Sequence, residues 1–188
     1  MPDSGILVLG KIQGARGVQG KIRVIRRGDM LDGLKKNSNL QLYSAQGIKD
    51  GFLMDPSFFG DYVMEEFSTL TNDTVELKLK NLTNTDEAWK LKGMFIGIKL
   101  SEAKIKFHNP KDPYLFEYIN LKIYEGDEFR GKVKRVDEYH SKQWLIGECG
   151  EDEVMIPLQG PYIENVDFPK GNLYIMLESG LFPSHEPA

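Results

Sequence analysis

The sequence predicts an all-β fold of two small antiparallel β-barrels with one short helix. Three observations lead to this prediction: short segments of alternating polar and apolar residues, turn-forming residues at short intervals between them, and a single segment with helical spacing. The chain has 188 residues, of which 40% are hydrophobic, and this suits two small domains that each have a packed core. Many short alternating segments separated by turns are typical of closed barrels or sandwiches.

The expected strands show a period of two, which directs one face of a strand to the core and the other to water. Residues 74–80 have the clearest alternation, and residues 21–26 follow it except at Ile25. Further alternating segments lie at residues 39–43, 62–67, 95–100, 121–124, 132–137, 144–148, 153–156 and 173–177.

The expected helix begins near Asn84, a residue type that caps helix N-termini, and Glu87 is placed to reach back to the cap. The apolar stripe consists of Ala88, Leu91 and, in part, Trp89. Gly93 is expected to end the helix. A helix of roughly nine residues is marginal in isolation and must therefore pack on a sheet.

The domain boundary is predicted where the alternation stops. Residues 101–113 have mixed charge and two prolines. We therefore predict an N-terminal barrel domain at residues 1–101, a linker at 102–113, a second barrel domain at 114–183 and a frayed tail at 184–188.

The net charge of −4 is unevenly distributed. Residues 1–36 contain eight Lys or Arg against three Asp, whereas residues 106–188 contain nine basic and fifteen acidic residues. We expect one end of the chain to meet phosphate groups and the other to avoid them. A solvated strand face that happens to be basic is an equally good interpretation of the charge alone.

The cysteine content and the N-terminus indicate a cytoplasmic protein. Cys149 is the single cysteine, so no intrachain disulfide can form, which fits a reducing compartment. Its strand-like surroundings favour a structural role. The N-terminus lacks the basic start and apolar core of a signal peptide, and no apolar stretch is long enough to span a membrane.

The most informative motif is LGKIQGARGVQGKIRV, whose glycines stand at positions 10, 14, 17 and 20 between two strand patterns. It does not fit the dinucleotide-binding fingerprint, because no helix follows. It is not a phosphate-binding loop either, because Ile22 stands where Ser or Thr would follow Gly20-Lys21. The glycines instead allow a tight turn with positive φ angles and a close approach of the backbone to a partner.

Five cationic residues accompany this turn: Arg16, Lys21, Arg23, Arg26 and Arg27. Alternation places Lys21 and Arg23 on one face of a strand. Guanidinium groups offer paired donors that match phosphate geometry. We therefore predict that these residues contact RNA. A surface hairpin without a partner is the alternative.

Aromatic residues alternate just after the predicted linker, at Tyr114, Phe116 and Tyr118. One interpretation is an exposed anchor for a protein partner, because aromatic side chains dominate interface hot spots. The other is a strand whose aromatic face lies in the second barrel. For Phe58, Phe59 and Tyr62 near Gly60 we expect core packing around a hairpin, and an exposed position is the alternative.

The sequence predicts no enzyme, metal or cofactor. His108, His140 and His185 are far apart and lack the spacing of metal ligands. No Ser or Cys has an evident His partner for nucleophilic catalysis. Carboxylate pairs such as Glu65-Glu66 are adjacent on strands, so they point to opposite faces. An unrecognised carboxylate site between the domains remains the enzyme alternative.

The chain resembles the RimM family of ribosome maturation factors in four segments that occur in the family's order. The family's opening glycine-rich hairpin resembles LGKIQGARGVQGKIRV, and its acidic helix with the following Leu-x-Gly and strand resembles NLTNTDEAWKLKGMFIGIKL. The Gly-x-Val strand of its second domain resembles EFRGKVKRVDEY, and its ending resembles EVMIPLQGPYIENVDFPKGNLYIMLESGL. The resemblance spans nearly the whole chain.

This resemblance implies an N-terminal barrel like those of translation factors and a C-terminal PRC-barrel. It also implies binding to the head of the assembling small ribosomal subunit, with small-subunit ribosomal protein nineteen and the 3′-domain rRNA as partners. Two positions differ from the family: Arg16 replaces its usual His, and the aromatic pair that commonly opens its second domain is matched only at Tyr114.

We therefore expect a monomeric binding scaffold that assists late folding and processing of small-subunit rRNA and catalyses no covalent chemistry. Arg16, Lys21, Arg23, Arg26 and Arg27 are the expected rRNA contacts, and Tyr114, Phe116 and Tyr118 the expected ribosomal-protein contacts. A PRC-barrel adaptor with a partner outside the ribosome is the alternative function.

Overall fold

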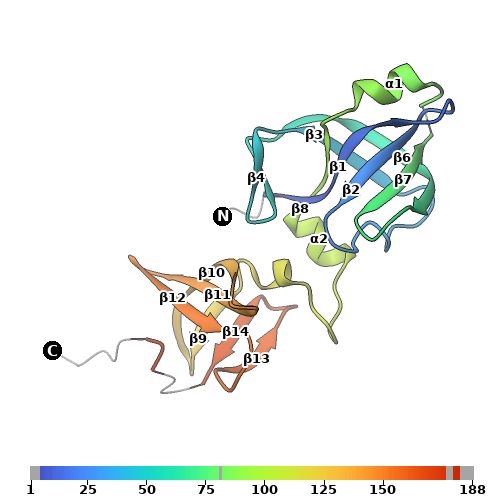
Figure 1. The fold of residues 1–188 in the computed structure, drawn as a ribbon. Coiled ribbons are helices and arrows are strands. Elements are labelled where there is room, and N and C mark those ends of the chain that lie inside the picture. Colours follow the sequence, from blue (N-terminus) through green and yellow to red (C-terminus); the bar gives the residue numbers. More distant parts are fainter. Residues whose placement is uncertain (1–4, 81, 177–179, 183–188) are drawn as a thin grey trace. The chain divides into compact units, whose positions relative to one another are not determined.

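The computed structural model describes residues 5–80, 82–176 and 180–182, and the chain divides into two compact units between Phe107 and His108 (Figure 1). The tail predicted at 184–188 lies outside the described residues. The predicted all-β class with two sheets is confirmed, as each unit is built around one sheet. None of the helices in the described ranges has the length and hydropathy of a membrane span.

The first unit contains strands and helices in the following order: β1 (Ile6–Arg16), β2 (Lys21–Arg26), β3 (Asn39–Ser44), β4 (Gly47–Lys49), β5 (Phe52–Met54), β6 (Ser57–Thr69), β7 (Thr74–Leu79), α1 (Thr85–Lys90), β8 (Phe95–Lys99) and α2 (Leu100–Lys106).

The strands of the first unit close into a barrel. The hydrogen-bonded order runs β2-β7-β6-β3-β8-β1, and β1 pairs with β2 to complete the ring. The β4–β5 hairpin extends from β1. Alternation in β1, β2 and β7 places apolar side chains inside, where Ile12, Ile22 and Leu77 are at most 1% exposed. Closure leaves no unpaired edge along these six strands.

Helix α1 forms where it is predicted. The Asn84 side chain accepts a hydrogen bond from the Glu87 backbone N–H at 2.9 Å, so the expected cap is confirmed. The Glu87 carboxylate accepts from the Thr83 backbone N–H at 3.1 Å, one residue before the cap. Gly93 follows the helix with a φ of 87°. The helix packs on β1 and β2, near the turn that joins them (Figure 1).

Helix α2 is not predicted by the sequence, and it runs from the end of the predicted first domain into the predicted linker at 102–113. Its N-cap position, Lys99, makes no side-chain capping bond, so the usual start signal is absent. Leu100 and Ala103 are fully buried against the barrel, whereas Ile105 is 84% exposed. Tertiary packing of Leu100 and Ala103 therefore stabilises a helix that its sequence only weakly specifies.

The second unit contains the 3-10 helix η1 (Leu115–Tyr118) and strands β9 (Lys122–Glu125), β10 (Glu128–Tyr139), β11 (Lys142–Cys149), β12 (Asp152–Pro157), β13 (Ile163–Asp167) and β14 (Asn172–Ile175). The sheet order is β12-β11-β10-β9-β14-β13, with β9 and β14 parallel and the other pairs antiparallel. Ile123, Leu145 and Leu173 are fully buried at the centre of its core. Cys149 packs against this core, and burial raises the pKa of its thiol.

Leu115–Tyr118 form a 3-10 helix with Tyr114 at its N-cap, so the interpretation of this aromatic segment as a strand is wrong. The physical reason is Glu117, which is 2% exposed. One of its carboxylate oxygens accepts from the Tyr114 backbone N–H at 2.8 Å, and the other contacts His108 Nδ1. These contacts close a tight turn that an extended strand could not form.

Candidate nucleic-acid interface

The β1–β2 hairpin is shaped by its glycines. A β-bulge between Ile12 and Gly14 places Gly14 opposite Arg23. At the turn, Gly17 and Gly20 have φ angles of 65° and 67°. A Cβ atom on Gly20 would lie 2.8 Å from the Leu82 carbonyl oxygen, so only glycine fits there. The expected tight, irregular turn is confirmed, and it packs on the start of α1.

Two of the predicted RNA-contact residues are held by acidic neighbours. Arg16 Nε lies 3.1 Å from a Glu76 carboxylate oxygen. Lys21 Nζ lies 3.2 Å from Glu76 and 3.3 Å from Glu66. The hydrogen bonds to Glu76 and Glu66 hold the pKa of the Lys21 ammonium above its usual range. Both cations are therefore largely neutralised by the barrel itself.

The Arg26 side chain links the loop after β2 to the turn between β6 and β7. Its Nη1 pairs with the Asp32 carboxylate, and its Nε donates to the Asn72 carbonyl oxygen at 2.6 Å. The side chain is only 17% exposed. This geometry suits a structural ion pair, in which the guanidinium nitrogens Nε and Nη1 already have partners.

Arg23 and Arg27 remain available. Both are exposed, and within the described residues no ion pair or side-chain hydrogen bond involves either guanidinium. Arg23 points outward because Ile22 and Val24 on either side of it are fully buried. Arg27 is fixed through its backbone N–H, which donates to the Leu9 carbonyl at 2.8 Å. Each of these two guanidinium groups can receive a phosphate with two donors.

The three aromatic residues of the second unit differ in exposure. Phe116 is 7% and Tyr118 is 8% exposed, so the packing interpretation holds for these two side chains. Tyr118 belongs to the core and meets Phe168 edge-to-face. Tyr114 is half-buried and stacks on Phe116 with ring centroids 5.3 Å apart. Tyr114 is thus the aromatic residue of the three that a partner can reach.

Sequence reasoning missed three exposed aromatic residues on the first unit. Trp89 was placed partly in the apolar stripe of α1 but is 48% exposed. Phe58 and Phe59 were expected in the core but are 55% and 48% exposed. A register shift opposite Leu42 and Tyr43 interrupts the alternation of β6 at Phe59, which explains why two consecutive residues are both exposed.

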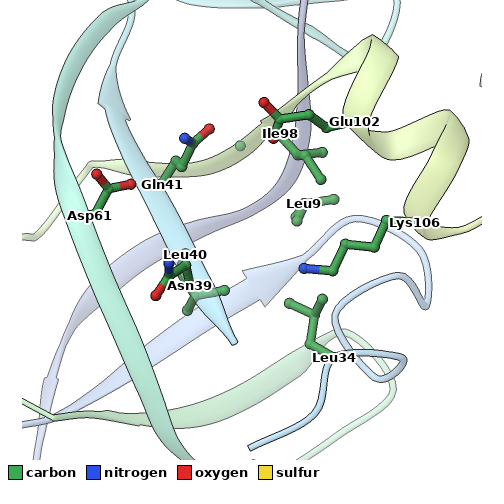
Figure 2. Close-up of a pocket in the computed structure, with 10 residues that line it drawn as sticks. Leu9, Leu34, Asn39, Leu40, Gln41, Asp61, Ile98, Glu102 and Lys106 are labelled. Atoms are coloured by element: carbon green, nitrogen blue, oxygen red, sulfur yellow. The ribbon is translucent and has the colours of Figure 1, made fainter. Parts of the chain in front are cut away.

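A pocket of about 450 Å³ lies on the first unit, between α2 and strands β3, β6 and β8. Its floor is apolar, with Leu9, Leu34, Leu40 and Ile98, and its rim carries Asn39, Gln41, Asp61 and Glu102. Figure 2 shows the Lys106 side chain reaching from α2 over this floor. The pocket shares no residue with either set of predicted contacts.

The fold and the site define a protein with one closed β-barrel and a second six-stranded sheet. Within the described residues, it presents two exposed guanidinium groups without an ion-pair partner, on β2 and directly after it. The chain belongs to the RimM family, because the RimM N-terminal domain family matches residues 7–103. This confirms the family suggested by the sequence motifs.

Two curated relatives and one solved structure illustrate the similarity. The ribosome maturation factor RimM of Streptococcus thermophilus is 27% identical over 175 residues, which cover 92% of this chain and 95% of the relative. The RimM of Streptococcus suis is 25% identical over 175 residues, which again cover 92% of this chain and 95% of the relative. The crystal structure of a 16S ribosomal RNA processing protein RimM from Pseudomonas aeruginosa is 20% identical, with 93% and 99% coverage and a TM-score of 0.41.

Proposed function

We propose that this protein is a cytoplasmic, monomeric ribosome maturation factor that binds the head of the assembling small ribosomal subunit. The first unit contacts 3′-domain rRNA, and the second contacts small-subunit ribosomal protein nineteen. The protein acts as a scaffold for late folding and processing of the rRNA and forms no covalent intermediate. Membership of the RimM family and the names of the relatives support this role.

The observation that carries the rRNA contact is that Arg23 on β2 and Arg27 directly after it are exposed, and that no described residue forms an ion pair with either. Arg16, Lys21 and Arg26 are engaged by acidic groups of the barrel, so Arg23 and Arg27 provide most of the attraction for phosphate. Contacts of this kind give affinity with little sequence readout. The rRNA is instead selected by its shape and by the ribosomal protein next to it.

The proposed action is a shift in population. A scaffold that binds one conformer of the immature subunit more tightly raises the fraction of that conformer. The size of the shift is set by the difference between its affinities for the two conformers. The second unit has an acidic sequence, and opposite charge accelerates its encounter with a basic ribosomal protein.

The experiment compares the wild-type chain with Arg23→Ala/Arg27→Ala in binding to purified small-subunit assembly intermediates over a series of salt concentrations. Loss of two phosphate contacts should lower the slope of log affinity against log salt by about 1.4, on the single-strand coefficient. The measurement is a filter-binding or sedimentation titration at each salt concentration.

Two variants serve as controls. Arg26→Ala removes a cation that is already paired, so it should lower stability and leave the salt slope unchanged. Lys132→Ala/Lys142→Ala removes two exposed cations from the second unit and should also preserve the slope. If the Arg23/Arg27 variant retains the wild-type slope and affinity, the hairpin does not bind rRNA.

Sedimentation of cell extract tests the role as a whole. The protein should travel with immature small subunits and be absent from translating ribosomes. Co-migration with a non-ribosomal complex would support the adaptor function instead.

A further inference from the structure

We propose that Trp89 is a stacking platform for an unpaired RNA base, with Arg23 and Lys92 receiving the phosphates on either side of that base. The inference rests on the proposed rRNA contact and specifies its form: the hairpin reads single-stranded RNA. Trp89 lies on α1, which sits beside the β1–β2 turn (Figure 1).

The position of Trp89 is fixed by the glycine hairpin. A Cβ atom on Gly14 would lie 2.7 Å from the Trp89 Cζ3 atom and 3.1 Å from Cη2. The indole therefore rests on bare backbone, and any larger residue at position 14 would displace it. The same glycine has a φ of 149°, which side-chain-bearing residues rarely adopt. This contact holds the ring in place while 48% of Trp89 stays open to solvent.

The ring is also adjacent to cationic groups. The Lys92 ammonium lies 5.1 Å from the centroid of the Trp89 ring, which is a cation–π contact. Gly14 is opposite Arg23 in the β1–β2 pairing, and paired Cα atoms lie roughly 5 Å apart. Arg23 and the indole therefore flank the same point of the hairpin. Lys92 is a flexible side chain that can leave the ring and meet a phosphate when a base stacks.

These groups match the chemistry of a single strand better than that of a protein. Sites for single-stranded nucleic acid combine aromatic side chains with cations that follow the backbone. An aromatic hot spot for a protein partner is instead surrounded by contacts that exclude water once the complex forms. The exposed Lys90 follows Trp89 in the chain, the exposed Lys92 lies over its ring, and the described pocket lies elsewhere on the unit.

The first test measures the affinity of the full chain for a labelled, unpaired oligoribonucleotide and for an RNA duplex, by fluorescence anisotropy. Trp89→Leu should weaken binding to the unpaired strand by about fivefold or more, because stacking on the ring is lost. The salt slope should be unchanged, because no charge is removed. Trp89→Phe should restore most of the affinity. Phe129→Leu, an exposed aromatic residue of the second unit, is the matched control.

The second test observes the ring directly. The chain has two tryptophans, and the buried Trp144 Nε1 has no hydrogen-bond partner within the described residues, so Trp144→Phe removes no hydrogen bond seen there. In Trp144→Phe, Trp89 is the single fluorophore of its kind. Stacking predicts that the unpaired strand quenches this fluorescence and that the duplex does not.

The outcomes separate this inference from the proposed function. Unchanged affinity of Trp89→Leu, or absent quenching, overturns the stacking role. If the stacking role fails and Arg23→Ala/Arg27→Ala still lowers the salt slope, the hairpin binds rRNA but Trp89 does not stack on a base. If Trp89→Leu loses equal affinity for the unpaired strand and for the duplex, the proposal that the hairpin reads single-stranded RNA is overturned. Tighter binding of Trp89→Leu to RNA together with lost binding to a ribosomal protein would assign Trp89 to a protein interface.

Discussion

Glu76 determines which cations of the hairpin can reach RNA. It lies on β7, opposite Arg23 in the pairing with β2, yet its carboxylate contacts Arg16 and Lys21. Only 14% of its side chain is exposed, so the ion pairs are partly shielded from solvent. One acidic residue thereby removes two cations from the surface that the sequence predicts as basic. Arg23 keeps its charge available because Glu76 is already occupied.

Replacing Glu76 tests this account at the residue scale. Glu76→Gln should release Arg16, whose guanidinium then meets phosphate, while Lys21 keeps Glu66. RNA affinity should rise, and the salt slope should steepen by about 0.7 for the one added contact. The measurement is the same titration against salt that tests Arg23 and Arg27.

The matched control is Glu66→Gln, which removes the same charge near Lys21 and leaves both pairs to Glu76 intact. It should raise affinity less than Glu76→Gln does. Equal effects of the two variants would mean that general repulsion, and not the release of Arg16, limits binding.

At the scale of elements, β-bulges decide which side chains share a face. In β10, a register shift between Val133 and Arg135 lets the neighbouring residues Lys134 and Arg135 both reach Glu153 on β12. The distances to its carboxylate are 3.0 Å and 2.9 Å. A regular strand would point these two residues to opposite faces. The bulge therefore builds an ion-pair cluster across the sheet.

This cluster predicts an acid sensitivity of the second unit. Hydrogen bonds from Arg135 and Lys134 lower the pKa of the Glu153 carboxyl to about 2, from an ordinary value of 4.5. A carboxyl whose pKa is lower in the folded state stabilises the fold above its unfolded pKa, and this contribution is lost as the pH falls through the folded value. Wild type should thus lose stability from this source between about pH 4.5 and pH 2.

Glu153→Gln should be less stable than wild type at neutral pH, and the difference should shrink as the pH falls through this range. Thermal unfolding followed at a series of pH values measures it. Glu151→Gln, which lies at the exposed turn before β12, is the charge-matched control. A constant difference between Glu153→Gln and wild type across the range would contradict the prediction.

At the scale of the whole molecule, the two units are expected to divide the partners. The first unit carries the exposed guanidinium groups, and the second carries Tyr114 at the start of η1. Each unit has a core of its own, centred on residues such as Ile22 in the first and Ile123 in the second. A surface change in one unit should therefore affect one partner only.

Tyr114→Ala tests this division. It should weaken binding to the isolated ribosomal protein nineteen by about fivefold or more, as for an aromatic hot spot. Its affinity for RNA and its unfolding temperature should stay close to those of wild type. Surface plasmon resonance with each partner and thermal unfolding measure these quantities.

Tyr118→Ala is the contrasting variant. This residue lies in the core, so its truncation should lower the free energy of unfolding by about 3–5 kcal/mol. If Tyr114→Ala lowers stability as much as Tyr118→Ala does, Tyr114 is a packing residue and the contact with the ribosomal protein lies elsewhere.

Local patterns along the chain were sufficient to predict several features of the fold. Period-two alternation predicted the strands, the Asn84 cap predicted α1, and the glycines predicted an irregular turn between β1 and β2. These features follow from backbone geometry and nearest neighbours along the chain. The order of the motifs also indicated the family.

Contacts between distant parts of the chain establish which cationic and aromatic side chains a partner can reach. Arg16 and Arg23 look alike in the sequence, and only the arrival of β7 beside β2 gives one of them an acidic partner. The placement of the Trp89 ring depends on Gly14, which is distant in sequence, and the burial of Phe116 depends on the turn that Glu117 closes. Long-range pairing and bulges set these outcomes, because ion pairs and burial depend on neighbours in space and the sequence pattern records only neighbours along the chain.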